Sequence, residues 1–190
     1  MTAEARAALE AFLPMDELLT RFSPARRVSL PAFDIAGEPL AAEELLDGVD
    51  DSVVDAIESL AALCDLLDDR LAPRSLRLPT EDELEAAFAG TLFPWGDHIP
   101  DGIPHGSQTA FRGHLEPDSR GLRLLGDPYQ VEITRTAVKL GDGGEALCGS
   151  YPWPVPWLSF SPSFRLAGDF VENLLFEFLE TAHVRPVRMD

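Results

Sequence analysis

The sequence predicts an α+β domain in which long irregular loops join short helices and strands. Residues 50–71 carry apolar side chains at three- and four-residue spacing, which is typical of an amphipathic helix. Residues 129–140 alternate in the manner of a strand. Residues 97–121 and 146–168 are rich in proline and glycine, which interrupt both kinds of element and favour loops.

Length and composition indicate a folded, non-membrane protein. The 190 residues suit one domain with a small appendage, and 45% hydrophobic residues are enough to build a core. No apolar run approaches the roughly 20 residues that a membrane-spanning helix needs. The N-terminus lacks the basic start and apolar centre of a secretion signal, so we expect a cytoplasmic location.

The charge balance disfavours two classes of partner. With 33 acidic and 15 basic residues, the formal charge is −18. Nucleic acids and anionic membranes are bound mainly through lysine and arginine, so we expect neither as a partner. The charge is interpreted first as a source of solubility.

The N-terminal segment predicts two short helices. Residues 3–22 have helical periodicity, and Pro14 is expected to separate the two parts. Residues 1–27 are interpreted as a helical extension that precedes a domain of residues 28–190. The beginning of that domain, residues 25–40, is expected to be extended, with three inward-facing side chains, Val28, Leu30 and Phe33.

Two further helices are predicted before residue 72. Residues 40–49 form a short amphipathic helix that ends near Gly48. Residues 50–71 form one helix capped by Ser52. Its apolar face is expected to hold Val53, Ile57, Leu60, Ala61, Cys64 and Leu67.

The two cysteines are interpreted as small buried apolar groups. Cys64 falls on the apolar face of the predicted helix over 50–71, and Cys148 precedes Gly149. A disulfide or a metal-binding pair is the alternative. Asp65, Asp68 and Asp69 lie on the opposite side of that helix and are expected to be solvated.

The stretch "RLPTEDELEAAFAGTLFPWGD" over residues 77–97 carries a helix start signal. Thr80 is a good N-cap, and Glu83 can complete a capping box with it. Leu84, Ala87 and Phe88 are expected to face inward, and Gly90 to stop the helix. A turn then follows at residues 94–96, with Trp95 as its buried anchor.

The last third of the chain predicts strands separated by irregular segments. We expect one strand over 129–140, a turn over 141–144, and an extended segment over 146–168 because of its four prolines. Residues 169–181 fit either a helix or a strand, and residues 183–190 are expected to end the chain as a strand.

These landmarks together resemble the formylglycine-generating enzyme family, also called the sulfatase-modifying factor family. The resemblance rests on "RLPTEDELEAAF" followed by "FPWGD", on "SLAALCDLLDD" and "PAFDIAGEPL" upstream, and on "CGSYPW", "SPSFRLAG" and "HVRPVR" downstream. It covers about residues 28–190. It implies a variant of the C-type lectin-like fold, rich in irregular loops.

The resemblance also implies a chemistry that this chain lacks the residues to perform. Oxidase members convert a substrate cysteine to formylglycine with copper held by two closely spaced cysteines, since thiolates select Cu(I). The matching positions fall near Trp153 and Leu158, neither of which binds a metal. We therefore expect a degenerate member without this oxidase activity and predict no cofactor.

Two metal sites are weighed as alternatives. The family's calcium segment matches "GLRLLGDPYQVEIT", which keeps Gly121, Leu122 and Glu132 but too few oxygen ligands for calcium. His98, Asp101 and His105 could instead form an open facial triad for iron. That triad would make the protein a non-haem metal-dependent oxidase, whereas loop residues of this kind usually hydrogen-bond to the loop itself.

The leading hypothesis is a pseudoenzyme that binds or scaffolds a protein or peptide partner. Proline-stiffened aromatic residues make good anchors for a partner, and the family's arginines could line the same groove. The candidate binding residues are Tyr151, Trp153, Trp157, Phe160, Arg165 and Arg185. Packing of these rings inside the domain is the alternative. A further possibility is that the N-terminal helices contact a partner.

Overall fold

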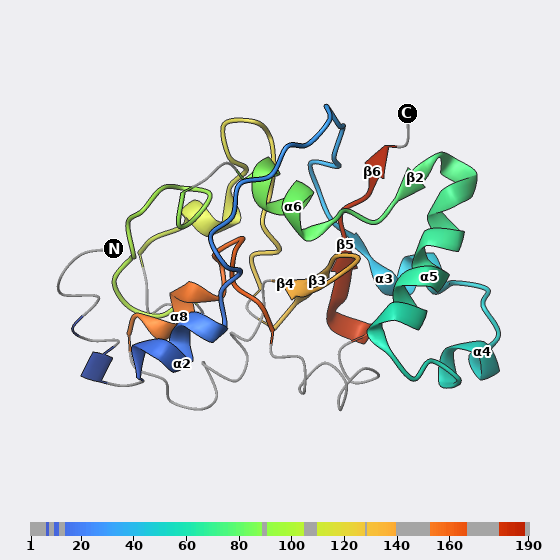
Figure 1. Cartoon of the computed structure of the whole chain (residues 1–190), viewed down its shortest axis with the longest axis horizontal. Helices are drawn as coiled ribbons and strands as arrows, with labels where there is room; N and C mark the ends of the chain where they lie inside the picture. The colour runs from blue at the N-terminus through green and yellow to red at the C-terminus, as the bar shows by residue number, and fades with distance from the viewer. Residues whose placement is uncertain are drawn as a thin grey trace.

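The structure is a computed structural model (Figure 1). It describes residues 7, 10–11, 14–88, 91–104, 110–127, 129–139, 153–166 and 179–188. The expected turn over 141–144 lies outside these residues, as do Gly90, His105, Cys148 and Tyr151. The described part is α+β, as the sequence predicts.

Two small sheets form the β part of the fold. In the first, β1 pairs antiparallel with β5, β5 pairs parallel with β3, and β3 pairs antiparallel with β4. The strands are β1 (Leu40–Ala41), β5 (Ala182–Val184), β3 (Val131–Ile133) and β4 (Val138–Lys139). The second sheet is an antiparallel pair of β2 (Leu76–Arg77) and β6 (Val187–Arg188). Both sheets thus join the C-terminal segment to distant parts of the chain.

The single strand expected over residues 129–140 is a hairpin. The chain reverses at Thr134, whose backbone N–H donates to the Ala137 carbonyl at 2.9 Å. The Thr134 hydroxyl oxygen also accepts from the Ala137 N–H at 3.0 Å. A threonine side chain that bonds to nearby backbone groups favours a turn over a continuing strand. The expected strand over 183–190 is likewise divided: its first residues belong to the end of β5, and β6 follows as a separate strand.

The single helix expected over residues 50–71 is also two helices, α4 (Asp51–Asp55) and α5 (Leu60–Leu71). Asp50, not Ser52, caps α4, because its carboxylate accepts from the Ser52 N–H at 2.9 Å. Ser59 caps α5 through the Ala62 N–H. A second cap inside one apolar stripe starts a second helix. The buried α5 face is Leu63, Cys64, Leu67 and Leu71, whereas Val53 and Ala61 are exposed.

Helix α6 (Glu81–Ala87) follows the prediction closely. Thr80 and Glu83 form the capping box, with the Thr80 N–H donating to the Glu83 carboxylate at 2.8 Å. Glu83 also pairs with Arg77 at 2.6 Å. The three expected inward residues, Leu84, Ala87 and Phe88, are buried. Trp95 is partly buried and stacks on Phe93, with ring centroids 4.8 Å apart.

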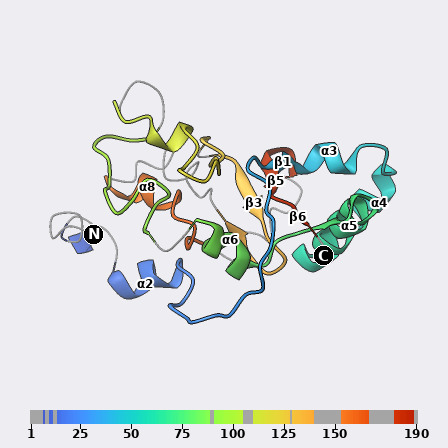
Figure 2. The same ribbon diagram turned by 90° about the horizontal axis from the view of Figure 1, so that it is seen from above.

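Two hydrophobic clusters divide the core between the two ends of the molecule (Figure 2). The first packs α5 and α3 (Ala42–Leu46) against the four-stranded sheet. The second joins α6, α8 (Val155–Leu158) and α2 (Met15–Thr20). As expected, α2 begins directly after Pro14, and its Leu18 is buried in the second cluster.

Three short 3-10 helices complete the described elements: η1 (Ala72–Arg74), η2 (Gly113–Leu115) and η3 (Leu179–Thr181). The short helix α8 corrects the expectation of a wholly extended segment over 146–168. Its proline lies in the first turn, where the missing N–H costs nothing. Val28, expected inside, is 45% exposed. Of the segment 169–181, only η3 is described.

Candidate functional site

The aromatic residues expected to bind a partner mostly lie inside the second core. Trp157 and Phe160 are 0% and 4% exposed. The Trp157 indole N–H donates to the Gly102 carbonyl at 2.8 Å, and that of Trp153, which is half-buried, donates to the Pro100 carbonyl at 2.7 Å. The buried rings anchor the loop over 97–104, so a partner has little access to them. Tyr151 lies outside the described residues.

Arg185, another candidate binding residue, is fully buried in an ion pair with Glu132. Its Nε donates to the carboxylate at 2.8 Å, and the other N–H groups reach the carbonyls of Ala36, Gly37 and Arg123 and the second carboxylate oxygen. All five guanidinium donors are therefore used inside the protein. Glu132 lies in the segment that the family resemblance matches to a calcium site, and here its carboxylate is paired with Arg185.

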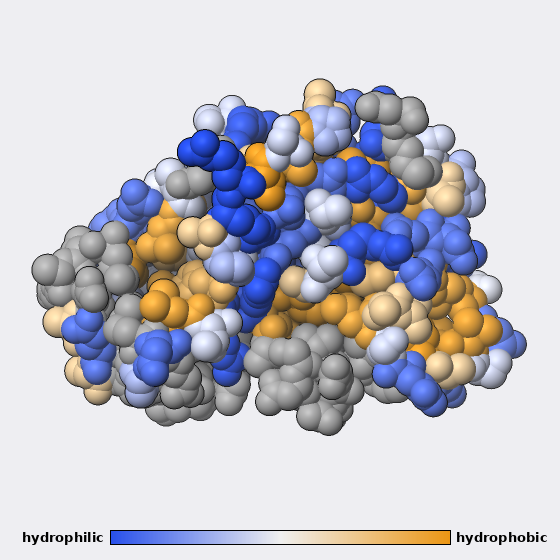
Figure 3. Space-filling model, viewed as in Figure 1, coloured by the Kyte–Doolittle hydropathy of each residue, from blue (hydrophilic) through white to orange (hydrophobic). Residues whose placement is uncertain are grey.

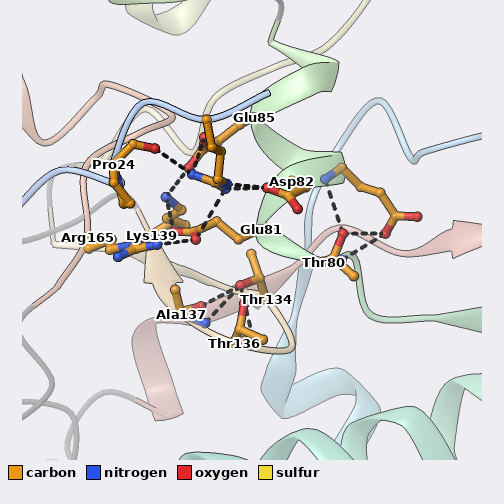
Figure 4. A network of polar contacts seen from close by, with 12 residues as sticks. Pro24, Thr80, Glu81, Asp82, Glu85, Thr134, Thr136, Ala137, Lys139 and Arg165 are labelled. Atoms are coloured by element: carbon orange, nitrogen blue, oxygen red, sulfur yellow. Dashed lines mark hydrogen bonds and ion pairs between the residues drawn. The ribbon is translucent and has the colours of Figure 1, made fainter. Parts of the chain in front are cut away.

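Arg165 belongs to a second ionic group, which we call the Glu81 cluster: Glu81, Asp82 and Glu85 of α6 with Arg26, Lys139 and Arg165. Figure 4 labels all of these residues except Arg26. Arg165 Nε donates to Glu81 at 2.6 Å, and Lys139 Nζ lies 2.6 Å from the same carboxylate. Arg26 approaches Glu81 at 3.4 Å and also pairs with Asp82. The cluster links α6 to β4 and to the segments around residues 26 and 165.

The environment of Glu81 stabilises its charged form. Burial alone raises the pKa of Glu81, but hydrogen bonds from Arg165 and Lys139 outweigh burial and lower the pKa to about 2. The carboxylate is thus held ionised as a structural acceptor. A general acid at neutral pH needs the opposite shift, so the cluster is suited to linking segments.

The two described residues of the proposed iron triad are exposed. His98 and Asp101 both face solvent, and His105 lies outside the described residues. Within the described ranges, no three His, Cys, Asp or Glu side chains are grouped to hold a metal. The triad stays a prediction, which metal analysis of the purified protein can decide.

Cys64 has the structural role expected of it. It is 1% exposed, and its thiol lies 3.5 Å from the Thr134 carbonyl. Burial raises the pKa of this thiol to about 12. The protonated form is a poor nucleophile and a poor metal ligand at neutral pH. Cys148, its partner in the alternative disulfide or metal pair, lies outside the described residues.

A groove of about 920 Å³ lies on the surface between α3, α4 and η3. The α3–α4 end of the molecule lies opposite the end that holds α2 and α8 (Figure 2). Apolar residues reach the surface beside hydrophilic ones over the region of α4 and α5 (Figure 3). The apolar lining of the groove consists of Leu46, Val49, Val54 and Leu179.

Five exposed carboxylates surround this apolar lining. They are Glu43, Glu44, Asp47, Asp51 and Glu180. Among the described residues, no basic side chain forms an ion pair with any of them. We call this feature, with its apolar lining and its carboxylates, the acidic groove.

Local sequence signals build the walls of the acidic groove. Gly48 adopts φ +76°, which lets the chain leave α3 in a left-handed conformation. Asp50 then caps α4 two residues later. Arg70 of α5 donates to the carbonyls of Leu45 and Asp47 at 2.8 Å, which ties the end of α3 in place. The α3–α4 corner is therefore held by a glycine, a cap and an arginine.

The sequence pattern does not indicate this groove. It predicts a helix over 40–49 that ends near Gly48, followed by one longer helix. The break at Ser59 separates α4 from α5, and η3 returns from far along the chain. A cluster of acidic residues over 43–51 was the available signal, but helix periodicity alone did not place it opposite η3.

No protein-family model, curated protein or solved structure matches the chain. Within the described ranges, no helix is both long and apolar enough to cross a bilayer.

Proposed function

We propose that this protein is a peptide-binding domain that holds a segment of a partner protein in the acidic groove. The observation that carries the proposal is the groove itself, whose apolar lining is partly buried (the floor) and whose carboxylates are exposed (the rim). Binding sites on proteins usually combine these two features, because apolar area supplies affinity and rim polarity supplies orientation.

The scaffold that we propose is a C-type lectin-like domain of the formylglycine-generating enzyme type that has lost its oxidase chemistry. The motif series over residues 28–190 supports this assignment, and Trp153 and Leu158 stand near the matching cysteine positions. Leu158 is buried, and the Trp153 indole donates to a backbone carbonyl. Folds of this kind host unrelated functions, so the binding role is argued from the groove.

The acidic groove takes the place of the aromatic surface as the proposed binding site. Trp157 and Phe160 are buried in the core, and the guanidinium of Arg185 donates its hydrogen bonds to Glu132 and to backbone carbonyls. The carboxylates of the groove, by contrast, form no ion pair among the described residues. Its five carboxylates are exposed, and Val49 is partly exposed.

Selection from a random peptide display library tests the proposal. The full chain serves as bait, and enriched peptides are measured by fluorescence anisotropy against Val49→Trp and Val53→Trp. Val49 lines the groove, whereas Val53 is 47% exposed and lies outside the lining. We expect the first variant to weaken binding by at least about tenfold, the loss of one well-placed contact, and the second to leave binding unchanged.

Two results would overturn the proposal. One is a selection that enriches no peptide with saturable binding. The other is a set of enriched peptides that bind both tryptophan variants as well as the wild-type protein. Circular dichroism and a thermal melt of each variant establish that the fold is retained before binding is compared.

A further inference from the structure

The acidic groove also indicates what kind of peptide it binds. Resting on the proposed function, we infer that the groove holds a cationic amphipathic helix of a partner protein, with the helix's apolar face on the groove floor and its lysine or arginine side chains on the rim. The inference follows from three properties of the groove: its charge, its floor and the secondary structure of its lining.

The charge of the rim selects a cationic partner. Glu43 and Glu44 lie on α3, Asp47 on the link to α4, Asp51 at the start of α4, and Glu180 on η3. Arg70 of α5 directs its guanidinium to backbone carbonyls of this corner. Like-charged groups around one groove are relieved by a ligand of opposite charge, which also associates faster.

The floor requires that the ligand be apolar on one side. Leu46 and Val54 belong to the α3 and α4 walls, and Leu179 lies on the η3 wall. These three side chains also pack against the first core cluster, so their positions are set by the fold before a ligand binds. A ligand that carries only charge, such as a polyamine, would leave this apolar area in water.

The secondary structure of the lining favours a helical ligand over an extended one. Every lining residue belongs to α3, α4, η3 or the link between α3 and α4, and none lies in a strand. An extended peptide gains affinity chiefly by adding to the edge of a sheet, which this lining does not provide. A helix satisfies its own backbone groups and needs only side-chain contacts, as in other helix-binding grooves.

A designed peptide tests the inference directly. The probe is a helical peptide of about 16 residues built from leucine and lysine, with leucines at i, i+3, i+4 and i+7 along one face. Binding to the full chain is measured by fluorescence anisotropy, and helix formation by circular dichroism. A peptide with every lysine replaced by glutamine tests the charge, and one with two internal prolines tests the helix.

The matched variants keep the net charge equal and change only its place. The groove variant is Glu44→Gln/Asp47→Asn/Glu180→Gln, and the control is Asp34→Asn/Glu38→Gln/Glu116→Gln, whose three carboxylates are exposed and lie outside the groove lining. We expect the groove variant to weaken binding by about tenfold, since each exposed ion pair contributes roughly 1.5- to 5-fold. The control is expected to bind within about twofold of wild type.

The apolar half of the contact is tested by Val49→Ser against Val53→Ser. We expect weaker binding only for Val49→Ser, because Val53 lies outside the lining. Equal binding to the two triple variants would show attraction to the overall charge and overturn the inference. So would full binding of the proline-containing peptide, or displacement of the helical peptide by millimolar spermidine.

The two proposals fail in different ways. If the display selection yields groove-dependent peptides that are neutral or rich in proline, the peptide-binding function stands and the cationic helix does not. If no selected peptide depends on Val49 and the designed peptide binds both triple variants equally, both proposals are overturned. Enrichment of basic amphipathic sequences that lose affinity in the groove variant supports both.

Discussion

Two buried glutamates of this protein are satisfied in different ways. Glu132 is fully buried and faces one arginine, Arg185, whose remaining donors reach backbone carbonyls. Glu81 lies at the edge of the interior and shares three cations, Arg26, Lys139 and Arg165, with its neighbours on α6. The first arrangement is closed to solvent, and the second is partly open.

The difference shows how exposure sets the consequence of losing one partner. Removing a charge from the closed pair leaves its opposite charge buried and alone, which is strongly destabilising. Removing one member of the Glu81 cluster leaves other cations in place and water nearby: Arg26 and Arg165 are 27% and 34% exposed. We therefore expect the effects of substitution to decrease from the closed pair through the cluster to the surface.

The largest effect is expected for Arg185→Met. The substitution removes the ion-pair partner of Glu132 and five hydrogen bonds of the guanidinium, two to the Glu132 carboxylate and three to backbone carbonyls. We expect a loss of about 3–5 kcal/mol in the free energy of unfolding, measured by urea denaturation. The control Arg188→Met, on an exposed side chain, should cost less than about 0.5 kcal/mol. A loss in Arg185→Met no greater than in the control would contradict the comparison.

The double variant Glu132→Met/Arg185→Met separates the pair from its surroundings. With both charges gone, no charge is left buried without a partner, so part of the lost stability should return. A double variant that is less stable than either single variant would show that the contacts of Arg185 with the carbonyls of Ala36, Gly37 and Arg123 matter more than the pair itself.

The next effect depends on pH and reports on the Glu81 cluster. The pKa of Glu81 is lowered from its ordinary value of 4.5 to about 2, so its contribution to stability is complete above pH 4.5 and is lost as the pH falls toward 2. Glu81→Gln should be less stable than wild type at neutral pH, and the gap should narrow on acidification. Urea denaturation from neutral pH down through the interval between pH 4.5 and 2 measures this difference in the free energy of unfolding.

The quantity to compare is the difference in free energy of unfolding between wild type and Glu81→Gln. The pKa values of Glu83 and Asp118 are also lowered, so both proteins lose some stability in acid for that shared reason. A gap that stays constant over this range would mean that the ionised form of Glu81 has no special stabilisation in the fold.

A smaller effect is expected from the cap that orients α6 and therefore Glu81. In Thr80→Ala the capping box loses its hydroxyl, which bonds the Glu83 N–H at 3.2 Å. We expect a loss of about 1 kcal/mol, seen as a lower denaturation midpoint. Thr136→Ala, at an exposed turn position, is the control and should change little. Equal losses of stability in Thr80→Ala and Thr136→Ala would show that the Thr80 cap does not specifically stabilise α6.

The smallest effect is expected at the surface, where Arg135 pairs with Asp65 at 2.9 Å. The two side chains are 39% and 73% exposed, so water and salt screen their attraction. Arg135→Gln should cost no more than about 1 kcal/mol, and the cost should shrink in high salt. A loss as large as that of Arg185→Met would mean that exposure does not rank these interactions.

Local features of the fold were predictable from neighbouring residues. The capping box at Thr80 and Glu83, the start of α2 after Pro14 and the end of α3 near Gly48 each depend on side chains within a few positions. The break between α4 and α5 was missed for a local reason too. Asp50 and Ser59 both cap, and a continuous apolar stripe conceals the second cap.

Long-range pairings were not predictable in this way. Glu132 and Arg185 are 53 positions apart, and sequence reasoning gave them two separate roles, in a calcium segment and in a binding surface. The parallel pairing of β3 with β5 brings them together. Similarly, the acidic residues over 43–51 line a groove only because η3, which is distant in sequence, packs beside α3 and α4.

The sequence by itself determined the supply of charge: 33 acidic side chains and 15 basic ones, so that more than half of the carboxylates must lack a dedicated cation. It also determined where α4, α5 and α6 start, because their side-chain caps act within one turn. Only the tertiary structure decided which carboxylates received partners. Glu81 has three cations around it, whereas the rim of the acidic groove has no ion-pair partner among the described residues. The physical reason is that ion pairs act over a few ångströms, and those distances exist only after distant segments have packed together.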